Sequence, residues 1–435
     1  MFRMKNCASL LLILFCQAAL TQERPLPAAE AKSQAATGDL PEPYPLARLV
    51  DRARERSHLL QAAEARVDER RLGAIQARTR PNPELSLALG PKWVGPEVGA
   101  LYELAVSQPL LYPGKFKLRG EAADLEAESA QLQRAEVELS LTYEVVRLAY
   151  EYSILQRRQE LAEQRQERFQ LVQSYLAGRL FPSPQKRAET QAVENRLCNL
   201  AVERLQIQTE RQAAWAKLNF YLGWEEDPQP GIRVPWLKGN RPLPLRELEG
   251  LAEQRNLSLA IQQAQVRIAE KEKALAEKER KPDFSLSAFY GQETAGETET
   301  AAGVGFTLPL PLLNRNQGNI LAAEKRLRAE DQLLRYQQQQ LESLLKQARV
   351  QFEGARQAAG RYPEALLSRL DQELQESEKE FRKGRVELLT FLELEAEAAE
   401  TKERALAAQS ELSNQLITIL FLAGEPDPVA WLDRY

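Results

Sequence analysis

The sequence predicts a mainly α-helical protein in which a short β-hairpin and a long helical hairpin occur twice, through a tandem duplication. Three observations lead to this fold class. Apolar residues recur at every seventh position over long stretches, which is the spacing of a coiled-coil seam. Other, shorter segments alternate apolar residues with small or polar ones, which is the period of a β-strand. Each kind of segment also has a counterpart about 200 positions further along the chain.

The duplication can be followed residue by residue. Pro109 and Pro309 stand 200 positions apart (309 − 109), and each ends an alternating segment. Upstream of these prolines the offset is 199, as between Ala65 and Ala264 (264 − 65). Solenoid repeats are roughly 20–50 residues long. A unit of this size therefore indicates a doubled domain rather than an array.

The N-terminus is predicted to be a signal peptide over residues 1–21. Arg3 and Lys5 precede an apolar run that is too short to cross a bilayer. A lipid anchor at Cys16 is a weaker alternative, because the bulky Phe15 stands where a small residue is needed.

The rest of the chain divides into a proline-rich tether, two repeats joined by a linker, and a tail. Each repeat contains a helix, then a β-hairpin, then a long helical hairpin. The predicted boundaries are 22–45 for the tether, 46–228 for the first repeat, 229–244 for the linker, 245–428 for the second repeat and 429–435 for the tail, with β-hairpins over 84–107 and 283–308 and helical hairpins over 115–222 and 317–422.

The first repeat opens with a helix expected over 46–77, which the prolines of Arg80-Pro-Asn-Pro83 stop. Two alternating strands follow, with a loop over 91–97 between them. Their apolar positions, with those of the second repeat, are Leu85, Leu87, Leu89, Tyr102, Leu104, Val106, Phe284, Leu286, Val304 and Phe306. Such strands fit either a half-buried soluble sheet or the lipid-facing strands of an outer-membrane protein.

The long helices are predicted from their seven-residue seams. One seam runs through Leu118, Leu125, Leu132, Leu139 and Val146, and others follow residues 317 and 387. Helical segments are expected over 115–177, 182–222, 317–383 and 387–422, with turns at Gly178 and Gly384 and a kink at Pro363. At 1.5 Å per residue the first of these is roughly 95 Å long.

No later stretch of the sequence is apolar enough for a transmembrane helix. Four strands cannot close a barrel, and an open sheet edge is not tolerated in lipid. Two chains would give an eight-stranded barrel filled by side chains, and three would give twelve strands around an open lumen. This argument favours an oligomer without fixing the number of copies.

Three sequence features resemble one family. Residues 309–318 read Pro-Leu-Pro-Leu-Leu-Asn-Arg-Asn-Gln-Gly, residues 280–286 read Arg-Lys-Pro-Asp-Phe-Ser-Leu, and helical turns contain Gly178 and Gly384. In this doubled order the chain resembles the TolC-like outer-membrane efflux family, in its heavy-metal resistance branch (cobalt-zinc-cadmium and copper-silver). The likeness covers nearly everything after Pro45.

The resemblance implies a homotrimeric outer-membrane channel with a twelve-stranded β-barrel in lipid and a periplasmic α-helical barrel. Such a channel is a passive exit duct, joined through a periplasmic adaptor (membrane fusion) protein to an inner-membrane resistance-nodulation-division pump. The branch implies heavy-metal cations as cargo. Pro182 and Pro184 depart from the family pattern at the first tip. A soluble periplasmic coiled-coil adaptor or scaffold remains the alternative.

Composition and residue inventory argue against an enzyme and against a nucleic-acid-binding protein. The net charge is −4, so no basic footprint for nucleic acid exists. His58 is the only histidine and Cys198 the only cysteine beyond the signal peptide, so neither a zinc cluster nor a Cys-His pair can form. We therefore expect no catalytic residue, cofactor or resident metal, and interpret Gly303-Val-Gly305 as close packing or bending in a strand.

Two sets of residues are candidate functional positions. The acidic residues near the second tip form either a charged coiled-coil exterior or a lumen-facing ring that favours cations. The tips are either plain helix ends or docking sites for the adaptor. The candidates are Glu373, Glu376, Glu380 and Glu387 for the lumen and Gly178, Arg179, Leu180, Gly384, Arg385 and Val386 for docking.

Overall fold

Two rounds of helix, β-hairpin and helical hairpin make up the described chain. The computed structural model describes residues 43–177, 183–225, 229–237, 244–295 and 297–435, all within one compact unit, Glu42–Tyr435. The predicted signal peptide, most of the tether and the turn of the first helical hairpin, at residues 178–182, lie outside these ranges.

The first round contains α1 (Leu46–Arg56), α2 (His58–Ala77), β2 (Glu84–Val94), β3 (Glu97–Leu110), α3 (Lys115–Ala177) and α4 (Pro184–Leu222). The second contains α5 (Leu245–Arg255), α6 (Leu257–Glu279), β5 (Phe284–Glu293), β6 (Glu299–Thr307), α7 (Gln317–Ala359), α8 (Glu364–Arg382) and α9 (Leu388–Leu422). This order confirms the predicted fold class: a mainly helical chain with tandem long helical hairpins and four main strands.

The helix expected over 46–77 is wrong as a single element, because the chain breaks at Ser57. The Ser57 side chain accepts a hydrogen bond from the Leu60 N–H at 3.2 Å and so caps α2. The second repeat breaks at the equivalent place, where the Asn256 side chain accepts from the Leu259 N–H at 3.0 Å. Serine and asparagine are preferred helix N-caps because their side-chain oxygens satisfy free backbone donors.

The continuous, kinked helix expected over 317–383 is also wrong. The chain leaves the helix after Ala359 and re-enters it at Glu364, directly after Pro363. Pro363 is extended, with ψ of 150°. Proline has no N–H and disfavours helical backbone in the residue before it, so it separates two helices here.

Both ends of the described chain are more ordered than the sequence suggested. Tyr44–Pro45, assigned to the tether, form β1 and pair in parallel with Ile232–Arg233 of the linker, which form β4. The C-terminal tail contains α10 (Pro428–Arg434), whose first turn is capped by the Asp427 side chain. Leu432 of this helix is completely buried.

The four main strands form one antiparallel sheet in the order β2-β3-β5-β6. The central β3–β5 pair joins the two repeats. The loop expected over 91–97 is wrong, because β2 continues to Val94 and β3 starts at Glu97, with the turn at Gly95. In the single chain Pro91 is tolerated in β2 because β2 lies at a sheet edge.

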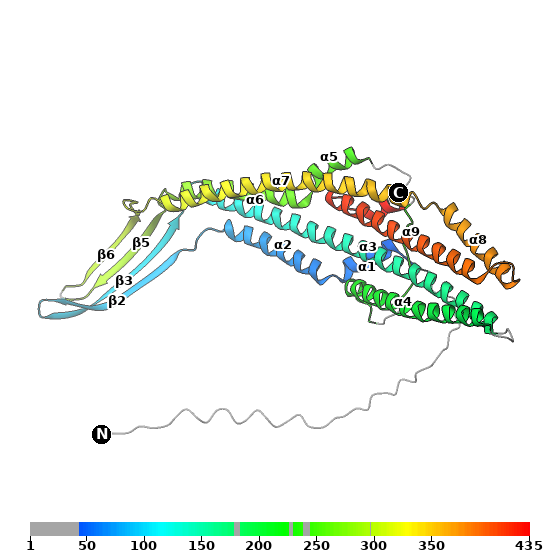
Figure 1. Ribbon diagram of the computed structural model, residues 1–435. Coiled ribbons are helices and arrows are strands. Elements are labelled where there is room, and N and C mark those ends of the chain that lie inside the picture. Colours follow the sequence, from blue (N-terminus) through cyan, green and yellow to red (C-terminus); the bar gives the residue numbers. More distant parts are fainter. Residues whose placement is uncertain (1–42, 178–182, 226–228, 238–243, 296) are drawn as a thin grey trace, which may run out of the picture. The chain divides into compact units, whose positions relative to one another are not determined.

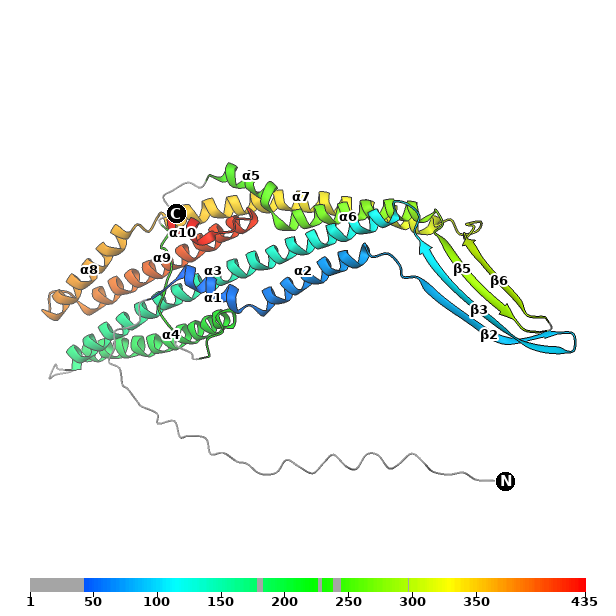
Figure 2. The same ribbon diagram turned by 180° about the vertical axis from the view of Figure 1, so that it is seen from behind.

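Besides a small cluster of α5, α6 and α7 residues, two hydrophobic clusters hold the helices together. The larger joins both repeats and includes the fully buried Tyr152, Leu218 and Leu416. The smaller lies near the ends of the helical hairpins and includes Phe169 and Phe391. Figures 1 and 2 show the sheet at one end of the long helices and the turn between α8 and α9 at the other.

Candidate functional site

The sheet has one continuous apolar face. Leu87 stands opposite Leu104, Leu104 opposite Tyr290, and Leu286 opposite Phe306. Residues directly opposite one another in a ladder point to the same side of the sheet. All ten apolar strand residues singled out from the sequence therefore share one face, together with Trp93, Val98, Ala288, Tyr290 and Ala302.

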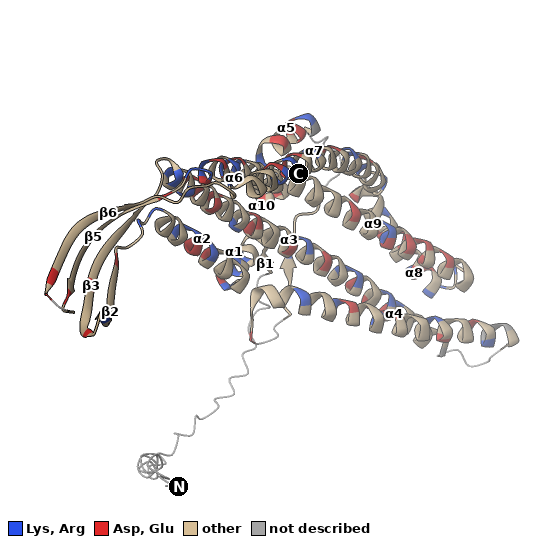
Figure 3. Cartoon of the chain, turned by 90° about the vertical axis from the view of Figure 1, so that its left-hand side faces the viewer, with Lys and Arg blue, Asp and Glu red and all other residues tan. Residues whose placement is uncertain are grey.

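No described part of the single chain covers this face. Leu85 is 70% exposed, Val304 is 89% exposed and Phe306 is 61% exposed. Within the described chain the strands pack chiefly on one another, and no helix packs extensively on them. In Figure 3 the strands are mostly uncharged along their length, whereas charged residues are scattered along the helices.

The opposite face is lined mainly by small and polar residues, with Val94, Leu101 and Phe289 as its large apolar side chains. A Cβ atom on Gly303 would lie 2.8 Å from Cζ of Phe289, and one on Gly305 would lie 2.6 Å from Oγ of Ser287. Both distances are shorter than real contacts allow, so a Cβ at either position would require Phe289 or Ser287 to move. The interpretation of Gly303-Val-Gly305 as close packing in a strand is confirmed.

Both edges of the sheet are open. Among the described strands, β2 pairs only with β3, and β6 pairs only with β5. Each edge strand therefore presents a row of backbone groups with no strand partner, which is a template for pairing with another chain.

The second helical tip ends α8 in a Schellman motif. The Gly384 N–H donates to the Phe381 carbonyl at 2.9 Å, and the Arg385 N–H donates to the Glu380 carbonyl at 3.0 Å. Gly384 has a φ of +75°, which favours glycine. Val386 packs on the smaller hydrophobic cluster, and Arg385 is exposed. The first tip, with Gly178, Arg179 and Leu180, lies outside the described residues.

The acidic candidates differ in their surroundings. Glu373, Glu376 and Glu387 are exposed, and the first two share a face of α8 with Glu380 through i, i+3 and i+7 spacing. Glu380 is different because it contacts Lys383 at 2.6 Å and Arg385 at 3.0 Å. These hydrogen bonds lower the pKa of the Glu380 carboxyl below its usual value.

Sequence reasoning missed two ion-pair layers that join the helical hairpins. Arg165 of α3 contacts the fully buried Glu395 of α9 at 2.8 Å and Glu203 of α4 at 3.5 Å. Seven residues earlier, Arg158 contacts Glu403 at 2.9 Å and Glu210 at 3.4 Å. The matching seven-residue spacings of Arg158 and Arg165 on α3 and of Glu203 and Glu210 on α4 are the signal that could have predicted them.

Among the described residues no group of histidine, cysteine, aspartate and glutamate side chains could hold a metal ion. His58 is exposed at the start of α2, and Cys198 is exposed on α4. None of the described helices combines the length and apolarity that a bilayer-crossing helix needs.

Residues 49–223 and 248–425 match the model of a family described as outer membrane efflux protein. This chain belongs to the outer membrane efflux protein family. The predicted membership of the TolC-like efflux proteins is thereby confirmed, and the two matched ranges follow the two repeats.

Solved structures of membrane proteins share the fold of this chain. A membrane protein from Pseudomonas aeruginosa matches with a TM-score of 0.70 at 18% identity, over 87% of this chain and 93% of that one. CusC matches with a TM-score of 0.66 at 16% identity, over 87% and 92%. VceC from Vibrio cholerae matches with a TM-score of 0.63 at 18% identity, over 87% and 96%. No curated protein matches the sequence.

Proposed function

We propose that three copies of this chain assemble side by side into a passive exit duct through the outer membrane. The observation that carries the proposal is the four-stranded sheet, which has one exposed apolar face and two open edges. Lipid would cover the apolar face, and strand pairing between copies would satisfy the edges. Three copies supply a twelve-stranded β-barrel with an open lumen, whereas two supply eight strands and a filled interior.

The exposed sheet face also weighs against a soluble periplasmic adaptor or scaffold. Such a protein would have to bury its apolar strand residues within the chain. Leu85, Leu87 and Val304 are instead 70%, 62% and 89% exposed. A patch of this size on a soluble monomer would cause aggregation.

In the proposed assembly the long helices form a periplasmic α-barrel that ends at the helical tips. An adaptor (membrane fusion) protein would dock there and connect the duct to an inner-membrane resistance-nodulation-division pump, which supplies the energy. Gly384, Arg385 and Val386 of the second tip, with 178–180 of the first, are the proposed docking residues. The resemblance of residues 309–318 to the heavy-metal branch supports metal cations as cargo.

Fractionation and conductance test the duct. We expect heat-resistant oligomers in the outer-membrane fraction, and discrete conductance steps when the purified protein is added to a planar bilayer. A soluble periplasmic monomer without conductance would reject the proposal.

The docking proposal is tested at Gly384. Gly384→Arg should abolish export in cells that contain the pump and adaptor, while the heat-resistant oligomer remains, because a bulky charge blocks the tip. Gly384→Asn is the control, since asparagine tolerates a positive φ and adds no charge. Retained export by Gly384→Arg would refute docking at this tip.

A further inference from the structure

The two repeats contact each other inside the chain through α3 and α6, which run antiparallel. Lys271 contacts Glu121 at 2.8 Å, and Arg267 contacts Glu128 at 2.8 Å. At the N-terminal end of α6, the Ser258 hydroxyl donates to Glu136 of α3. These three pairs fix the register of the contact.

Each of these positions has a counterpart in the other repeat, on α2 or α7. An offset of 200 takes α3 to α7, and an offset of 199 takes α2 to α6. The counterparts of the α3–α6 pairs are therefore Leu321 with Leu72 (121 + 200 and 271 − 199), Arg328 with Asp68 (128 + 200 and 267 − 199), and Tyr336 with Leu59 (136 + 200 and 258 − 199).

The counterparts are exposed, although the positions they copy are in contact. Leu72 is 65% exposed and Leu321 59%, and Leu59 and Tyr336 are 64% and 60% exposed. Even small residues follow this pattern. Ala264 of α6 is completely buried, whereas its counterpart Ala65 of α2 is exposed.

The exposed counterparts are also chemically matched. Leu72 with Leu321 and Leu59 with Tyr336 are apolar pairs, and Asp68 with Arg328 is a pair of opposite charge with its signs reversed relative to Glu128 and Arg267. In the single chain Asp68 contacts only Arg71, at 3.7 Å, and Arg328 contacts Glu324 at 2.5 Å, among the described residues. Exposed pairs within one helix are weak, so both side chains can pair again across an interface.

We infer that α2 of one copy packs antiparallel on α7 of the next, in the register Leu59–Tyr336, Asp68–Arg328 and Leu72–Leu321. The partner is a second copy of this chain, and the inference rests on the proposed assembly. Interfaces between copies then alternate with the interface between repeats around the duct. The contact inside the chain uses ion pairs, whereas the contact between copies uses apolar pairs around one ion pair.

The same offsets give the register of the sheet edges. Inside the chain Val106 stands opposite Ala288 and Leu110 stands opposite Phe284. Their counterparts pair Phe306 of one copy with Leu89 of the next, and Leu310 with Leu85. Residues 308–310 lie beyond the end of β6 in the single chain, and Leu310 is 69% exposed. In the assembly these residues extend β6, as their counterparts do in β3.

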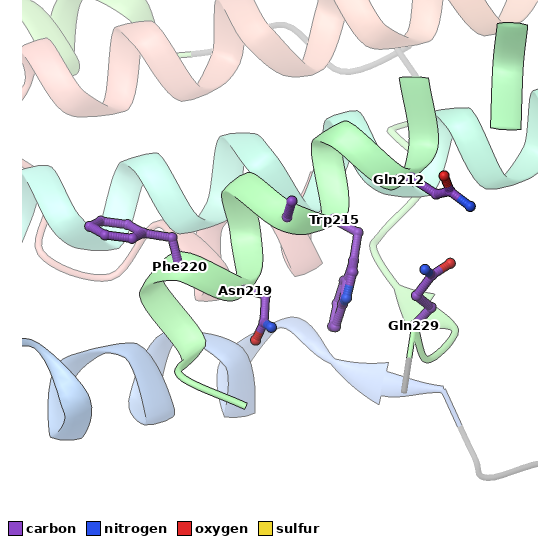
Figure 4. Close-up of a pocket in the computed structure, with 6 residues that line it drawn as sticks. Gln212, Trp215, Asn219, Phe220 and Gln229 are labelled. Atoms are coloured by element: carbon purple, nitrogen blue, oxygen red, sulfur yellow. The ribbon is translucent and has the colours of Figure 1, made fainter. Parts of the chain in front are cut away.

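Phe220 of α4 belongs, with the exposed residues of α2, to the surface that we infer the neighbouring copy covers. It stands out from the last turns of α4 beside a shallow groove that Trp215, Asn219 and Gln229 help to line (Figure 4). Phe220 is 81% exposed, whereas its counterpart Leu420 is fully buried in the cluster where α9 meets α3. By the same mapping Phe220 is covered by α7 of the neighbouring copy.

Disulfide trapping tests the register. The background carries Cys198→Ser, because Cys198 is exposed on α4. We expect Leu72→Cys combined with Leu321→Cys to convert most of the monomer band into covalent oligomers when isolated outer membranes are oxidised, because a disulfide requires Cβ atoms about 3.5–4.5 Å apart. The single variants should form none. Leu59→Cys with Tyr336→Cys is a second pair in register.

The matched control is Leu59→Cys with Leu321→Cys, which uses the same helices but is shifted by 13 residues (72 − 59), or about 20 Å. Cross-linking of this pair in place of the in-register pairs would overturn the inference. So would the absence of cross-links in heat-resistant oligomers that still conduct, and in that case the proposed duct would stand. A soluble monomer without conductance would overturn both.

Exchanging the charges of Asp68 and Arg328 tests the same register independently, without cysteine variants. Asp68→Arg and Arg328→Asp should each lower the temperature at which the oligomer dissociates in detergent, and the double variant should recover it. If the dissociation temperature of the double variant fell by the sum of the two single decreases, the pairing of Asp68 with Arg328 would be contradicted.

Discussion

Two glycines at helix ends have similar backbone angles but different surroundings. Gly384 and Gly424 have φ of +75° and +68°, and each ends a helix in a Schellman motif. A Cβ on Gly384 would meet nothing within 4 Å, whereas one on Gly424 would lie 2.5 Å from the Arg255 carbonyl oxygen. Left-handed backbone costs a residue with a Cβ about 1–2 kcal/mol. Gly384→Ala should lower the free energy of unfolding by that amount, and Gly424→Ala should lower it by more.

Urea unfolding of the detergent-solubilised protein, followed by its helical circular dichroism signal, measures both glycine variants. If both variants lost the same free energy of unfolding, the predicted clash with Arg255 would be contradicted, and the cost of the left-handed backbone alone would explain both losses.

The buried pair of Arg165 and Glu395 is a second residue-scale case. Glu395 is completely buried, and its Oε2 atom has no hydrogen-bond partner among the described residues. Arg165→Leu should therefore lower the free energy of unfolding by about 3–5 kcal/mol, because it leaves a buried carboxylate without its cation. Adding Glu395→Leu should recover part of this loss, since no buried charge then remains.

Glu203→Gln is the matched control for that pair. Glu203 contacts the same arginine at 3.5 Å, but its side chain is 37% exposed. We expect a loss under about 1 kcal/mol for this variant. A loss as large as that of Arg165→Leu would show that the outer carboxylate, and not Glu395, holds the guanidinium.

At the scale of elements, an ion pair fixes the junction where strands become helices. Asp283, just before β5, accepts from Lys115 at 2.8 Å and from the Tyr112 N–H at 2.7 Å. Partial burial alone would raise the pKa of the Asp283 carboxyl, but these hydrogen bonds outweigh it and the pKa is lowered. Lys115 is only 3% exposed, so Asp283→Asn should cost about 1–3 kcal/mol near neutral pH.

The pH dependence of this junction follows from the direction of the shift. A carboxyl whose pKa is lowered in the folded state stabilises the fold above its unfolded pKa, about 3.9, and this contribution is lost as the pH falls through the folded pKa. The difference in thermal midpoint between wild type and Asp283→Asn should therefore shrink below about pH 4. A constant difference down to pH 3 would contradict the assignment.

The regular elements could be predicted from sequence because each follows a period. The seam of α9 at Phe391, Ala398, Ala405, Leu412 and Ile419 is buried throughout, and the strand faces have the expected alternation. The breaks were not predicted, because they depend on single side chains. Ser57 and Asn256 are ordinary polar residues until a cap is formed, and the burial of α10 depends on a tertiary contact.

The candidate functional surfaces divide in the same way. The shared face of the strands could be predicted, since it needs only the period of two. The neutralisation of Glu380 by Lys383 and Arg385 could not, because it depends on the geometry of the turn after α8. The ion-pair layers of Arg158 and Arg165 needed the positions of three helices at once.

At the scale of the whole molecule, the acidic tip residues determine whether the duct prefers cations. Glu373, Glu376 and Glu387 are exposed and have no ion-pair partner among the described residues, whereas Glu380 is paired with two cations. Carboxylate rings raise the local cation concentration in a pore only if their charge is uncompensated.

We therefore expect cation selectivity to fall in the triple variant Glu373→Gln, Glu376→Gln and Glu387→Gln. Selectivity is measured as the reversal potential across a planar bilayer in a salt gradient. Glu380→Gln is the control. It removes one negative charge, which Lys383 and Arg385 already compensate, whereas the triple variant removes three uncompensated ones, so its effect on the reversal potential should be smaller. An unchanged reversal potential in the triple variant would indicate that these side chains lie on the outside of the helical barrel, and the charged-exterior interpretation would then hold.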